Sequence, residues 1–397
     1  MKILQINKFL YPMGGAETYM FKLSEALSAS GHTVKFWGMA HEKNIVDDEY
    51  NSFISQIDYN KISTLEKITS SISTIYSIES VKKINRFLDQ WLPDIVHIHN
   101  YNFQITPSIL KVFKSRNIKV VQTIHDSQMV CPYHRLYNFQ RETTCTKCVT
   151  GSFSNCIKDR CFDNSVFKSV IGAAESYLYH GLDYYNKYID HYISPSLFLK
   201  ELVQKRVNKP IVVIPNFVDE LLPDNELLSN KDSYYLYYGR VSKEKGIADI
   251  VTIFESLNLP LYIVGNGDAV ADIKESKYIT YLGPKYGEEL FSLIAKAKYV
   301  IQPSKWFENC PMTIIESFSL GIPVIGADHS GFLELISNDI TGYRVDFTNK
   351  NKLQAELKKI DTNYNVKLRH QSKEFFDNNL SKNHHLKQLL SVYETVL

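Results

Sequence analysis

Short apolar runs and longer amphipathic stretches alternate along the first half of the chain. Residues 18–29 carry apolar side chains at Met20, Leu23, Ala26 and Leu27, which is the spacing of a helix with one buried face. A glycine turn precedes this stretch and an apolar run lies on each side, so a strand–loop–helix–strand unit is predicted. The predicted strands of this half cover residues 1–8, 33–37, 94–99, 119–124, 190–194 and 210–216.

The second half repeats this pattern after a polar, acidic segment at residues 219–233, which is typical of an interdomain linker. A chain of 397 residues suffices for two ordinary domains. The sequence predicts an α/β fold with an N-terminal domain of residues 1–220, a C-terminal domain of residues 221–375, and a final helix, 376–397, that packs back on the first domain. The predicted strands of the second half are 234–238, 261–264, 279–283, 299–302, 323–326 and 342–345.

Two segments of the first half are less regular. Residues 42–92 have little strand pattern and are predicted to be mostly helical, with a loop near 42–60. Residues 164–190 form a helical stretch rich in Phe, Tyr and Ile. Most of these side chains are expected in the core, whereas an exposed remainder with Lys168 and Lys187 would suit a peripheral membrane contact.

Composition narrows the class of protein. Apolar residues make up 44% and charged residues 22% of the chain, as in ordinary globular proteins. The net charge of +2 argues against a nucleic-acid partner. No apolar run approaches the roughly 20 residues that span a bilayer, and the first residues are predicted to form a strand instead of a secretory signal. A cytoplasmic protein is therefore expected, with peripheral attachment to the membrane as an addition.

The most informative stretch holds two carboxylates eight positions apart, Glu308 and Glu316, with a helix start between them. Pro311 suits the first position of a helix, because the N–H that proline lacks would be unpaired there. Gly321 and Pro323 end the helix. Since the positive end of this helix opens after Glu308, the stretch predicts a site for an anionic ligand.

A second stretch supplies cations. The strand at 234–238 ends at Gly239-Arg240, and Lys245-Gly246 opens the next helix. Arginine offers phosphate a planar fork and lysine a mobile point charge, so this loop is predicted to cradle a diphosphate; a solvated charge pair is the alternative. Residues 265–268, Gly-Asn-Gly-Asp, follow the next strand and form a second loop where backbone approaches closely.

The first half contributes Gly14, Gly15 and His125, which follow strands at the edge where open α/β sheets bind ligands. The glycines do not form the G-x-G-x-x-G dinucleotide fingerprint, and a simple tight turn is the alternative. A single histidine is more often structural than functional, so spacing alone leaves both roles for His125 open.

Five of the six cysteines lie within residues 131–161. Four of them have the spacing C-x2-C-x7-C-x4-C, and both pair spacings fall in the range of structural zinc sites, although the central gap is short. Zinc, reduced thiols and a disulfide pair are all compatible with this pattern. The predicted ligands are Cys145, Cys148, Cys156 and Cys161, with Cys131 as a possible substitute for one of them.

Together these motifs resemble the retaining, nucleotide-sugar-dependent glycosyltransferases with the GT-B fold, of the group 1 and family 4 type. The resemblance covers nearly the whole chain apart from the cysteine-rich insertion. The matching motifs are the glycine loop at residues 14–17, the Arg240 and Lys245 pair, the E-x7-E signature from Glu308 to Glu316, and the Pro-Asn-Phe-Val-Asp turn at residues 215–219. That turn has Phe217 where the family has glycine.

The resemblance implies two Rossmann-like domains with a cleft between them and a role for each motif. Arg240 and Lys245 would stabilise the leaving diphosphate without a metal cofactor. Glu308 would contact hydroxyls of the donor sugar and Glu316 the ribose, while His125 would face the donor sugar. The other implied donor-binding residues are Gly14, Gly15, Gly239, Gly265, Gly267, Asn309, Cys310, Pro311 and Met312.

The resemblance implies transfer of a sugar from a nucleoside diphosphate to a glycan or lipid-linked acceptor, in surface polysaccharide biosynthesis. A sugar-nucleotide epimerase or a phosphorylase on the same fold is an alternative. A subunit that binds the nucleotide sugar without turning it over is a second alternative. The base, the donor sugar and the acceptor are not encoded in any pattern recognised here.

Overall fold

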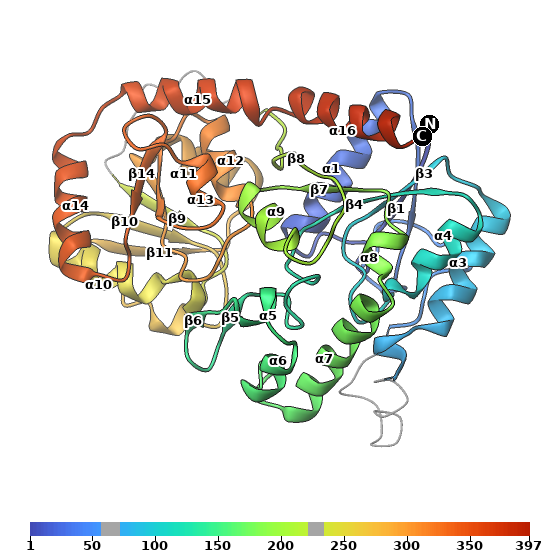
Figure 1. Cartoon of the computed structure of the whole chain (residues 1–397). Helices are drawn as coiled ribbons and strands as arrows, with labels where there is room; N and C mark the ends of the chain where they lie inside the picture. The colour runs from blue at the N-terminus through green and yellow to red at the C-terminus, as the bar shows by residue number, and fades with distance from the viewer. Residues whose placement is uncertain (57–71, 221–233) are drawn as a thin grey trace. The chain divides into compact units, whose positions relative to one another are not determined.

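The computed structural model describes residues 1–56, 72–220 and 234–397 (Figure 1). Its internal contacts separate two compact units. Unit 1 comprises Met1–Gln140, Cys145–Ile214 and Leu386–Leu397, and unit 2 comprises Arg141–Thr144 and Pro215–His385. Within the described residues, no helix is long and apolar enough to cross a membrane.

Unit 1 is built on a six-stranded sheet in the order β2-β1-β3-β4-β7-β8, and every adjacent pair is parallel. Such a sheet is covered by helices on both faces, which explains why its central strands are almost entirely buried. They are mainly apolar but also bury polar side chains, among them Gln5, His97 and Gln122. The strands are β1 (Lys2–Ile6), β2 (Thr33–Trp37), β3 (Ile95–Ile98), β4 (Lys119–Thr123), β7 (His191–Ser194) and β8 (Ile211–Val213), and a short strand β5 (Tyr137–Asn138) lies outside the sheet.

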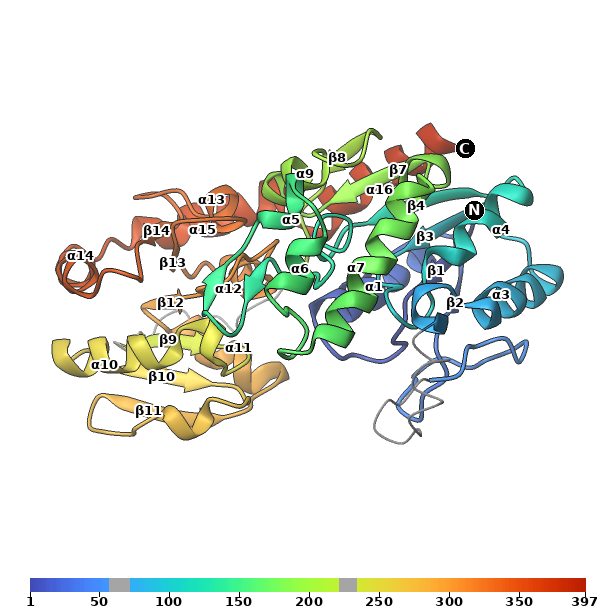
Figure 2. The ribbon, with the colours of Figure 1, turned by 60° about the horizontal axis from the view of Figure 1, so that its bottom comes forward.

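The helices of unit 1 can be followed in Figure 2, where α7 runs beside α6. They are α1 (Gly15–Ala29), α3 (Ile78–Gln90), η1 (Pro107–Ile109), α4 (Leu110–Ser115), α5 (Lys147–Thr150), α6 (Ser154–Lys158), α7 (Val166–Gly181), α8 (Tyr184–Lys187) and α9 (Leu197–Val203). The last helix of the chain, α16 (Lys382–Val396), begins in unit 2 and continues into unit 1. There the hydroxyl of Tyr393 and Nδ1 of the buried imidazole of His97 form a hydrogen bond of 2.7 Å.

Unit 2 has a second six-stranded parallel sheet, in the order β11-β10-β9-β12-β13-β14. Counted within the unit this is the order 3-2-1-4-5-6, which reverses direction beside the first strand. The strands are β9 (Tyr235–Tyr238), β10 (Leu261–Val264), β11 (Ile279–Gly283), β12 (Tyr299–Gln302), β13 (Val324–Ala327) and β14 (Gly342–Val345), with β6 (Thr143–Thr144) also counted in this unit.

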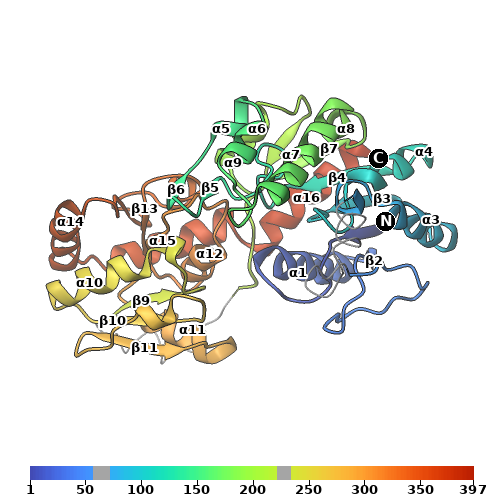
Figure 3. The same cartoon turned by 90° about the horizontal axis from the view of Figure 1, so that it is seen from below.

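Alternate residues of β9 point to opposite faces of this sheet. Leu236 and Tyr238 join a core with α11, α12, α13 and α15, whereas Tyr235 and Tyr237 join a core with α10 and α14. Figure 3 shows the same helices around the strands of unit 2. The helices are η2 (Lys243–Lys245), α10 (Ile247–Leu257), η3 (Val270–Asp272), α11 (Gly287–Lys296), α12 (Met312–Ser319), α13 (Phe332–Leu335), α14 (Lys350–Thr362) and α15 (Lys367–Asn379).

The predicted parallel α/β architecture is confirmed, and two local predictions need correction. Helix α1 begins at Gly15, three residues before the predicted start, because Glu17 lies in the first turn and accepts a hydrogen bond from Asn7 over 3.1 Å. The loop predicted near residues 42–60 is confirmed over residues 42–56, which contain turns and no helix, and the part of the prediction at 57–71 lies outside the described residues. Pro311 is the N-cap of α12, not its first helical residue.

The glycine loops after β9 and β10 pack backbone against backbone. Gly265 has a φ of +141°, and a Cβ placed there would lie 1.8 Å from the carbonyl oxygen of Gly239. A Cβ on Gly267 would lie 2.0 Å from the carbonyl oxygen of Val241. The amide of Gly239 in turn donates to Val264 over 3.1 Å. These glycines are therefore required by the fold itself, in addition to the donor-binding role that the sequence predicts for them.

We expect Gly265→Ala to destabilise unit 2 by about 1–3 kcal/mol, because the methyl group can be placed only by separating the two loops. Gly181→Ala is the control, since nothing lies within 4 Å of the Cβ position there. Thermal unfolding followed by circular dichroism measures both. Equal melting temperatures for the Gly265 variant and the wild type would contradict the packing described for these loops.

Candidate active site

The candidate site of unit 2 lies where the strand order reverses, beyond the carboxyl ends of β9 and β12. Open parallel sheets bind ligands at this point, because the loops after the two central strands diverge there. The loop after β9 carries Arg240 and Lys245, and the loop after β12 carries Glu308. The structure therefore brings together the two motifs that the sequence places about 65 residues apart.

The loop after β9 is anchored by a side chain of β9 itself. Tyr237 donates its hydroxyl to the carbonyl oxygen of Arg240 over 2.6 Å. Gly246 ends the loop with a φ of +73°, and a Cβ there would lie 2.5 Å from the carbonyl oxygen of Pro303. A glycine at this position thus lets the cationic loop pack directly on the loop after β12.

Glu308 is the centre of the site. Its Oε1 accepts hydrogen bonds from Lys245 Nζ at 2.5 Å, from Ser304 Oγ at 2.5 Å and from Trp306 Nε1 at 2.7 Å. All three donors reach the same oxygen, and Oε2 has no partner among the described residues. The side chain is only 13% exposed. One carboxylate oxygen therefore holds the loops together while the other is left for a ligand.

The charge state of Glu308 follows from these contacts. Burial by itself would raise the pKa of this carboxyl group. The Lys245 ammonium and the hydrogen bonds from Lys245, Ser304 and Trp306 outweigh burial and hold its pKa below the usual range. Glu308 is thus ionised at neutral pH and acts as an acceptor only, which suits sugar hydroxyls and excludes a role as a proton donor.

Trp306 places the two cations side by side. The guanidinium of Arg240 lies 5.2 Å and the ammonium of Lys245 lies 5.3 Å from the centre of the indole ring, within the range of cation–π attraction. Arg240 also pairs with Glu244 at 3.2 Å, yet 49% of its side chain is exposed. A half-exposed guanidinium next to a buried ammonium forms a positively charged surface that fits an anion.

The backbone around Glu308 is fixed by the loop after β13. The Glu308 amide donates to Ser330 Oγ over 3.1 Å, and the Gly331 amide donates to the Glu308 carbonyl over 2.9 Å. His329 Nε2 lies 3.1 Å from the carbonyl oxygen of Ser304. A Cβ on Gly331 would lie 1.6 Å from the carbonyl oxygen of Asn309, so this close approach requires glycine.

The helix that follows, α12, begins after Pro311, which makes no side-chain cap hydrogen bond. The amide of Ile314 in its first turn donates to the carbonyl oxygen of Pro311 over 3.1 Å. Cys310 is buried, and its carbonyl accepts from Asn216 over 3.2 Å. Glu316 is half-buried in the second turn, close enough to Tyr238 for its charge to raise the pKa of that phenol, as burial also does.

The departure from the family turn at Phe217 has a structural explanation. Phe217 is buried and packs on His385, with 4.7 Å between the ring centres. It is not among the described residues with positive φ, so the turn does not need a glycine. The aromatic side chain therefore replaces the glycine without straining the backbone beside Asn216.

In unit 1, His125 follows β4 and stacks on His99 with 5.2 Å between the ring centres. His99 Nε2 lies 2.7 Å from Gln5 Oε1, and His99 Nδ1 lies 2.9 Å from His125 Nε2. With Gln5 Oε1 as the acceptor, His125 donates from Nε2, and its Nδ1 is unprotonated. Burial lowers the pKa of His125 to about 4, so the imidazole is neutral at pH 7.

Gly14 and Gly15 are exposed at the start of α1. Gly14 is extended, with φ −163°, and the atom nearest to a Cβ there would be Glu17 Oε2 at 3.5 Å, an ordinary contact. In contrast to Gly265, the fold does not demand a glycine at this position. The absence of a side chain at Gly14 is therefore compatible with close approach of a ligand.

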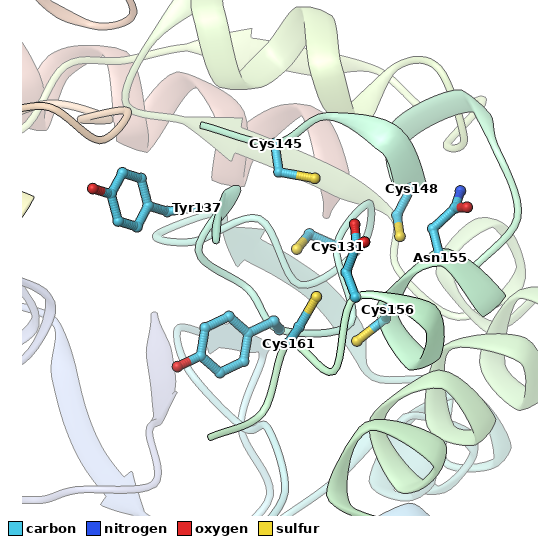
Figure 4. Close-up of a pocket in the computed structure, with 9 residues that line it drawn as sticks. Cys131, Tyr137, Cys145, Cys148, Asn155, Cys156 and Cys161 are labelled. Carbon is cyan, nitrogen blue, oxygen red and sulfur yellow. The ribbon is translucent and has the colours of Figure 1, made fainter. Parts of the chain in front are cut away.

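The cysteine-rich insertion also belongs to unit 1. One pocket is lined by all five of its cysteines, and none of them forms a disulfide. They are Cys131, Cys145, Cys148, Cys156 and Cys161 (Figure 4). Among the described residues, no group of three or more His, Cys, Asp or Glu side chains is placed so that it could hold a metal ion. The zinc prediction therefore remains a prediction at this point.

Sequence reasoning missed several residues of the site in unit 2. Ser304, Trp306, His329 and Ser330 have no role in the sequence prediction, yet each contacts Glu308 or the loop that carries it. Trp306 stands two positions before Glu308. The chain has only three tryptophans, so the presence of one in this loop is a signal that could have been used. The loop after β13 reaches the site because of the order of the strands in the sheet, and this order cannot be read from the sequence.

Comparison with known proteins gives two family matches that together span most of the chain. The model described as Glycosyltransferase Family 4 matches residues 13–220, more than half of the chain. The model described as Glycosyl transferases group 1 matches residues 218–375. The second match contains the whole site built around Glu308.

Two distant relatives cover most of the chain. An O-antigen chain mannosyltransferase C of Escherichia coli is 20% identical over 100% of this chain and 99% of the relative. An uncharacterized 42.6 kDa protein in the cps region of Klebsiella pneumoniae is 22% identical over 84% of this chain and 87% of the relative.

Solved structures show the same fold. Sucrose-phosphate synthase from Thermosynechococcus elongatus superposes with a TM-score of 0.72 at 16% identity, over 99% of this chain and 98% of that one. The HepE protein of Anabaena in complex with UDP superposes with a TM-score of 0.69 at 14% identity, over all of both chains. On the family matches, and with a GT-B fold of two parallel-sheet units, the chain belongs to the group 1, family 4 glycosyltransferases.

Proposed function

We propose that this glycosyltransferase moves a sugar, with retention of anomeric configuration, from a nucleoside-diphosphate donor to a glycan or lipid-linked acceptor. The observation that carries the proposal is the grouping of Arg240, Lys245 and Glu308 around Trp306 at the strand-order reversal of unit 2. A diphosphate needs fixed cations and a sugar needs a hydrogen-bond acceptor, and this site provides both within one pair of loops.

The cations act on the leaving group. Transfer breaks the bond between the anomeric carbon and the phosphate oxygen, and the bonding electrons remain on the diphosphate. Arg240 and Lys245 stabilise that developing charge, so no metal cofactor is needed in the proposed reaction. The acceptor hydroxyl forms the new bond to the anomeric carbon and loses its proton.

Glu308 orients the donor sugar. Its Oε1 is occupied by three donors, while Oε2 has no partner among the described residues. Because the carboxylate is ionised, Oε2 accepts hydrogen bonds from sugar hydroxyls, and such charge-assisted bonds are stronger than neutral ones. Asn309, Cys310, Pro311 and Met312 then lead the chain into α12 beside the diphosphate.

Glu316 is proposed to bind the ribose. It follows the uncapped start of α12 by one turn, and a carboxylate is well suited to accept from the two ribose hydroxyls. Gly239, Gly265 and Gly267 keep the neighbouring loops free of side chains, so that the nucleotide can lie against their backbone.

Unit 1 supplies the remaining proposed contacts. Its neutral imidazole, His125, is held by His99 and is proposed to face the donor sugar. Gly14 and Gly15 leave room for the donor phosphates beside the start of α1. We assign binding of the acceptor to the loops of this unit, because the N-terminal domain is the acceptor side in this family.

A role in surface polysaccharide assembly is supported by the names of the relatives. One is an O-antigen chain mannosyltransferase, and another is encoded in a cps region. Both relatives cover most of the chain but are only about one fifth identical to it. They therefore support the class of product, a surface polysaccharide, and not a particular sugar. The donor base and sugar remain to be measured.

The replacement of both cations tests the donor assignment. We expect Arg240→Ala with Lys245→Ala to lower kcat by on the order of 100–1,000-fold, because the charge on the leaving diphosphate loses its stabilisation. Transfer is measured with a panel of UDP-, GDP- and ADP-sugars and a lipid-linked acceptor extract. Lys243→Ala is the matched control, since Lys243 is exposed in the same loop and contacts neither Trp306 nor Glu308.

Because Lys245 also neutralises a buried carboxylate, its loss can destabilise unit 2. Arg240→Ala alone, at a half-exposed position, keeps the fold and should lower kcat in the same direction. Normal transfer by both variants would refute the phosphate assignment. Release of a free, epimerised sugar without acceptor would indicate an epimerase, dependence on phosphate a phosphorylase, and donor binding without turnover a binding subunit.

Helix α7 is the proposed membrane contact. One face is buried through small and polar residues, among them Ser169, Gly172 and Ala173. The expectation that most of the apolar side chains of this helix lie in the core is therefore wrong. The other face leaves large apolar side chains exposed, including Phe167 at 56%. The exposed apolar residues on and next to α7 are Val166, Phe167, Val170, Tyr177 and Leu182.

If this face lies on a membrane, the wild type floats with vesicles that contain anionic lipid, and Phe167→Ser with Val170→Ser remains in the soluble fraction. Leu333→Ser in unit 2, which removes a comparably exposed apolar side chain elsewhere, is the control and should float like the wild type. Absence of the wild type from the vesicle fraction would remove the membrane contact from the proposal.

A further inference from the structure

A line of polar side chains crosses the centre of the sheet of unit 1, where a core would ordinarily be apolar. Gln5 stands in β1, His97 in β3 and Thr123 in β4, and His99 and His125 follow the last two of these strands. Gln5 is the register partner of His97. Because alternate residues of a strand share a face, all five side chains lie on one face of the sheet. The proposed transfer reaction uses only His125 of this line.

The two imidazoles at the end of the line are neutral. Burial and the neighbouring imidazoles lower the pKa of His99 well below its usual value, and burial lowers the pKa of His125 to about 4. At pH 7 each ring therefore carries one proton on one of its two nitrogens. The nitrogen that carries the proton is set by the hydrogen bonds of the ring.

The hydrogen bonds start from Gln5 and lead to His125. An amide oxygen can only accept, so Oε1 of Gln5 requires the proton of His99 to stand on Nε2, 2.7 Å away. Nδ1 of His99 is then an acceptor, and it lies 2.9 Å from Nε2 of His125. His125 must therefore donate from Nε2. The oxygen of Gln5 thus determines the tautomer of an imidazole with which it shares no hydrogen bond.

The other half of the Gln5 amide indicates more than a packing role. Gln5 is fully buried, and its Nε2 has no hydrogen-bond partner among the described residues. A buried donor that stays unpaired costs about 1–3 kcal/mol. An apolar side chain at this position would avoid that cost. The amide is accounted for by the acceptor that its oxygen provides for His99.

Neighbouring rings hold His99 in its orientation. The ring of His97 stacks on it with 4.5 Å between the ring centres, and the ring of His125 stacks on it with 5.2 Å. Tyr19 of α1 meets His99 and His125 edge-on, at 5.9 Å and 5.3 Å between ring centres. Aromatic rings favour both arrangements. This packing restrains a flip of the His99 ring, which would exchange its two nitrogens.

His97 is itself fixed through both of its nitrogens. Nδ1 lies 2.7 Å from the hydroxyl of Tyr393 in α16, and Nε2 lies 2.7 Å from the hydroxyl of Thr123 in β4. Tyr393 is fully buried, as is His97. The last turns of α16 therefore support the ring on which His99 stacks.

We propose that Gln5 and His99 are positioning residues for the sugar transfer, which hold the ring of His125 in place with its proton on Nε2. This inference rests on the proposed function, in which His125 faces the donor sugar. A neutral imidazole donates from one nitrogen and accepts at the other, so its tautomer determines which hydrogen bonds it can make. A fixed tautomer keeps His125 ready for one arrangement of the donor sugar.

The tautomer is measured by nuclear magnetic resonance of the full chain labelled with 15N-histidine, because protonated and unprotonated ring nitrogens differ widely in chemical shift. The signals of His125 are assigned by their loss in His125→Ala. We expect the wild type to carry the proton on Nε2 and none on Nδ1. Gln5→Leu removes the amide acceptor and His99→Phe removes both hydrogen bonds but keeps a ring, so both variants should show mixed tautomers of His125.

Kinetics separates a positioning role from a merely structural one. With the sugar nucleotide that the donor panel identifies, Gln5→Leu and His99→Phe should lower kcat roughly 10–100-fold, because a misplaced group slows the chemical step. The KM for the donor should stay unchanged, since unit 2 is proposed to bind the donor. His191→Phe is the matched control, because His191 is half-buried at the first residue of β7, at the opposite edge of the sheet. It should keep both the tautomer and kcat.

The wild-type spectrum keeps the proposal testable if the variants do not fold. A proton on Nδ1 of His125 in the wild type, or a mixture of tautomers there, would overturn it. So would an unchanged tautomer or a normal kcat in folded Gln5→Leu and His99→Phe. Normal transfer by His125→Ala would instead refute the sugar contact of His125 in the proposed function, whereas the tautomers would still report whether Gln5 and His99 fix this ring.

Discussion

The partly buried ion pair between Glu308 and Lys245 is the interaction on which the candidate active site depends. It joins the loop after β9 to the loop after β12 at the point where the strand order of unit 2 reverses. A buried carboxylate without a partner would be costly, and here the lysine, a serine and an indole N–H together stabilise it on a single oxygen. The same arrangement leaves the second oxygen and the other lysine protons for a ligand.

Backbone packing supplies the rigidity around this pair. Gly246, Gly265 and Gly331 each allow two loops to approach to a distance that any side chain would prevent. The hydrogen bonds of Ser330 and His329 then fix the loop that carries Glu308 from its far side. A site with preorganised charges needs such support, because misplaced cations stabilise a leaving phosphate poorly.

Much of this organisation was predictable from sequence. Short apolar runs alternating with amphipathic helical stretches predicted the parallel α/β units, and strands such as Leu261–Val264 and Tyr299–Gln302 have the predicted bounds. The pairing of Arg240 and Lys245 with Glu308 followed from the resemblance to a family. The hydrogen bonds of Trp306 and Ser330 did not, because they depend on which loops the strand order makes neighbours. The structure also shows that Gly265 is needed for packing, a distinction that a glycine-rich motif alone cannot make.

Binding by Glu308→Gln tests the central claim most directly. Glutamine keeps one oxygen for Lys245, Ser304 and Trp306 but replaces the ligand-facing oxygen with an amide that cannot accept from a sugar hydroxyl. Isothermal titration should show an unchanged Kd for the nucleoside diphosphate. For the matching sugar nucleotide, the Kd should be roughly 10–100-fold weaker, because the loss of one or two hydrogen bonds to a charged group weakens binding by about that factor. Equal loss for both ligands, or no loss for either, would contradict the assignment of Glu308 to the donor sugar.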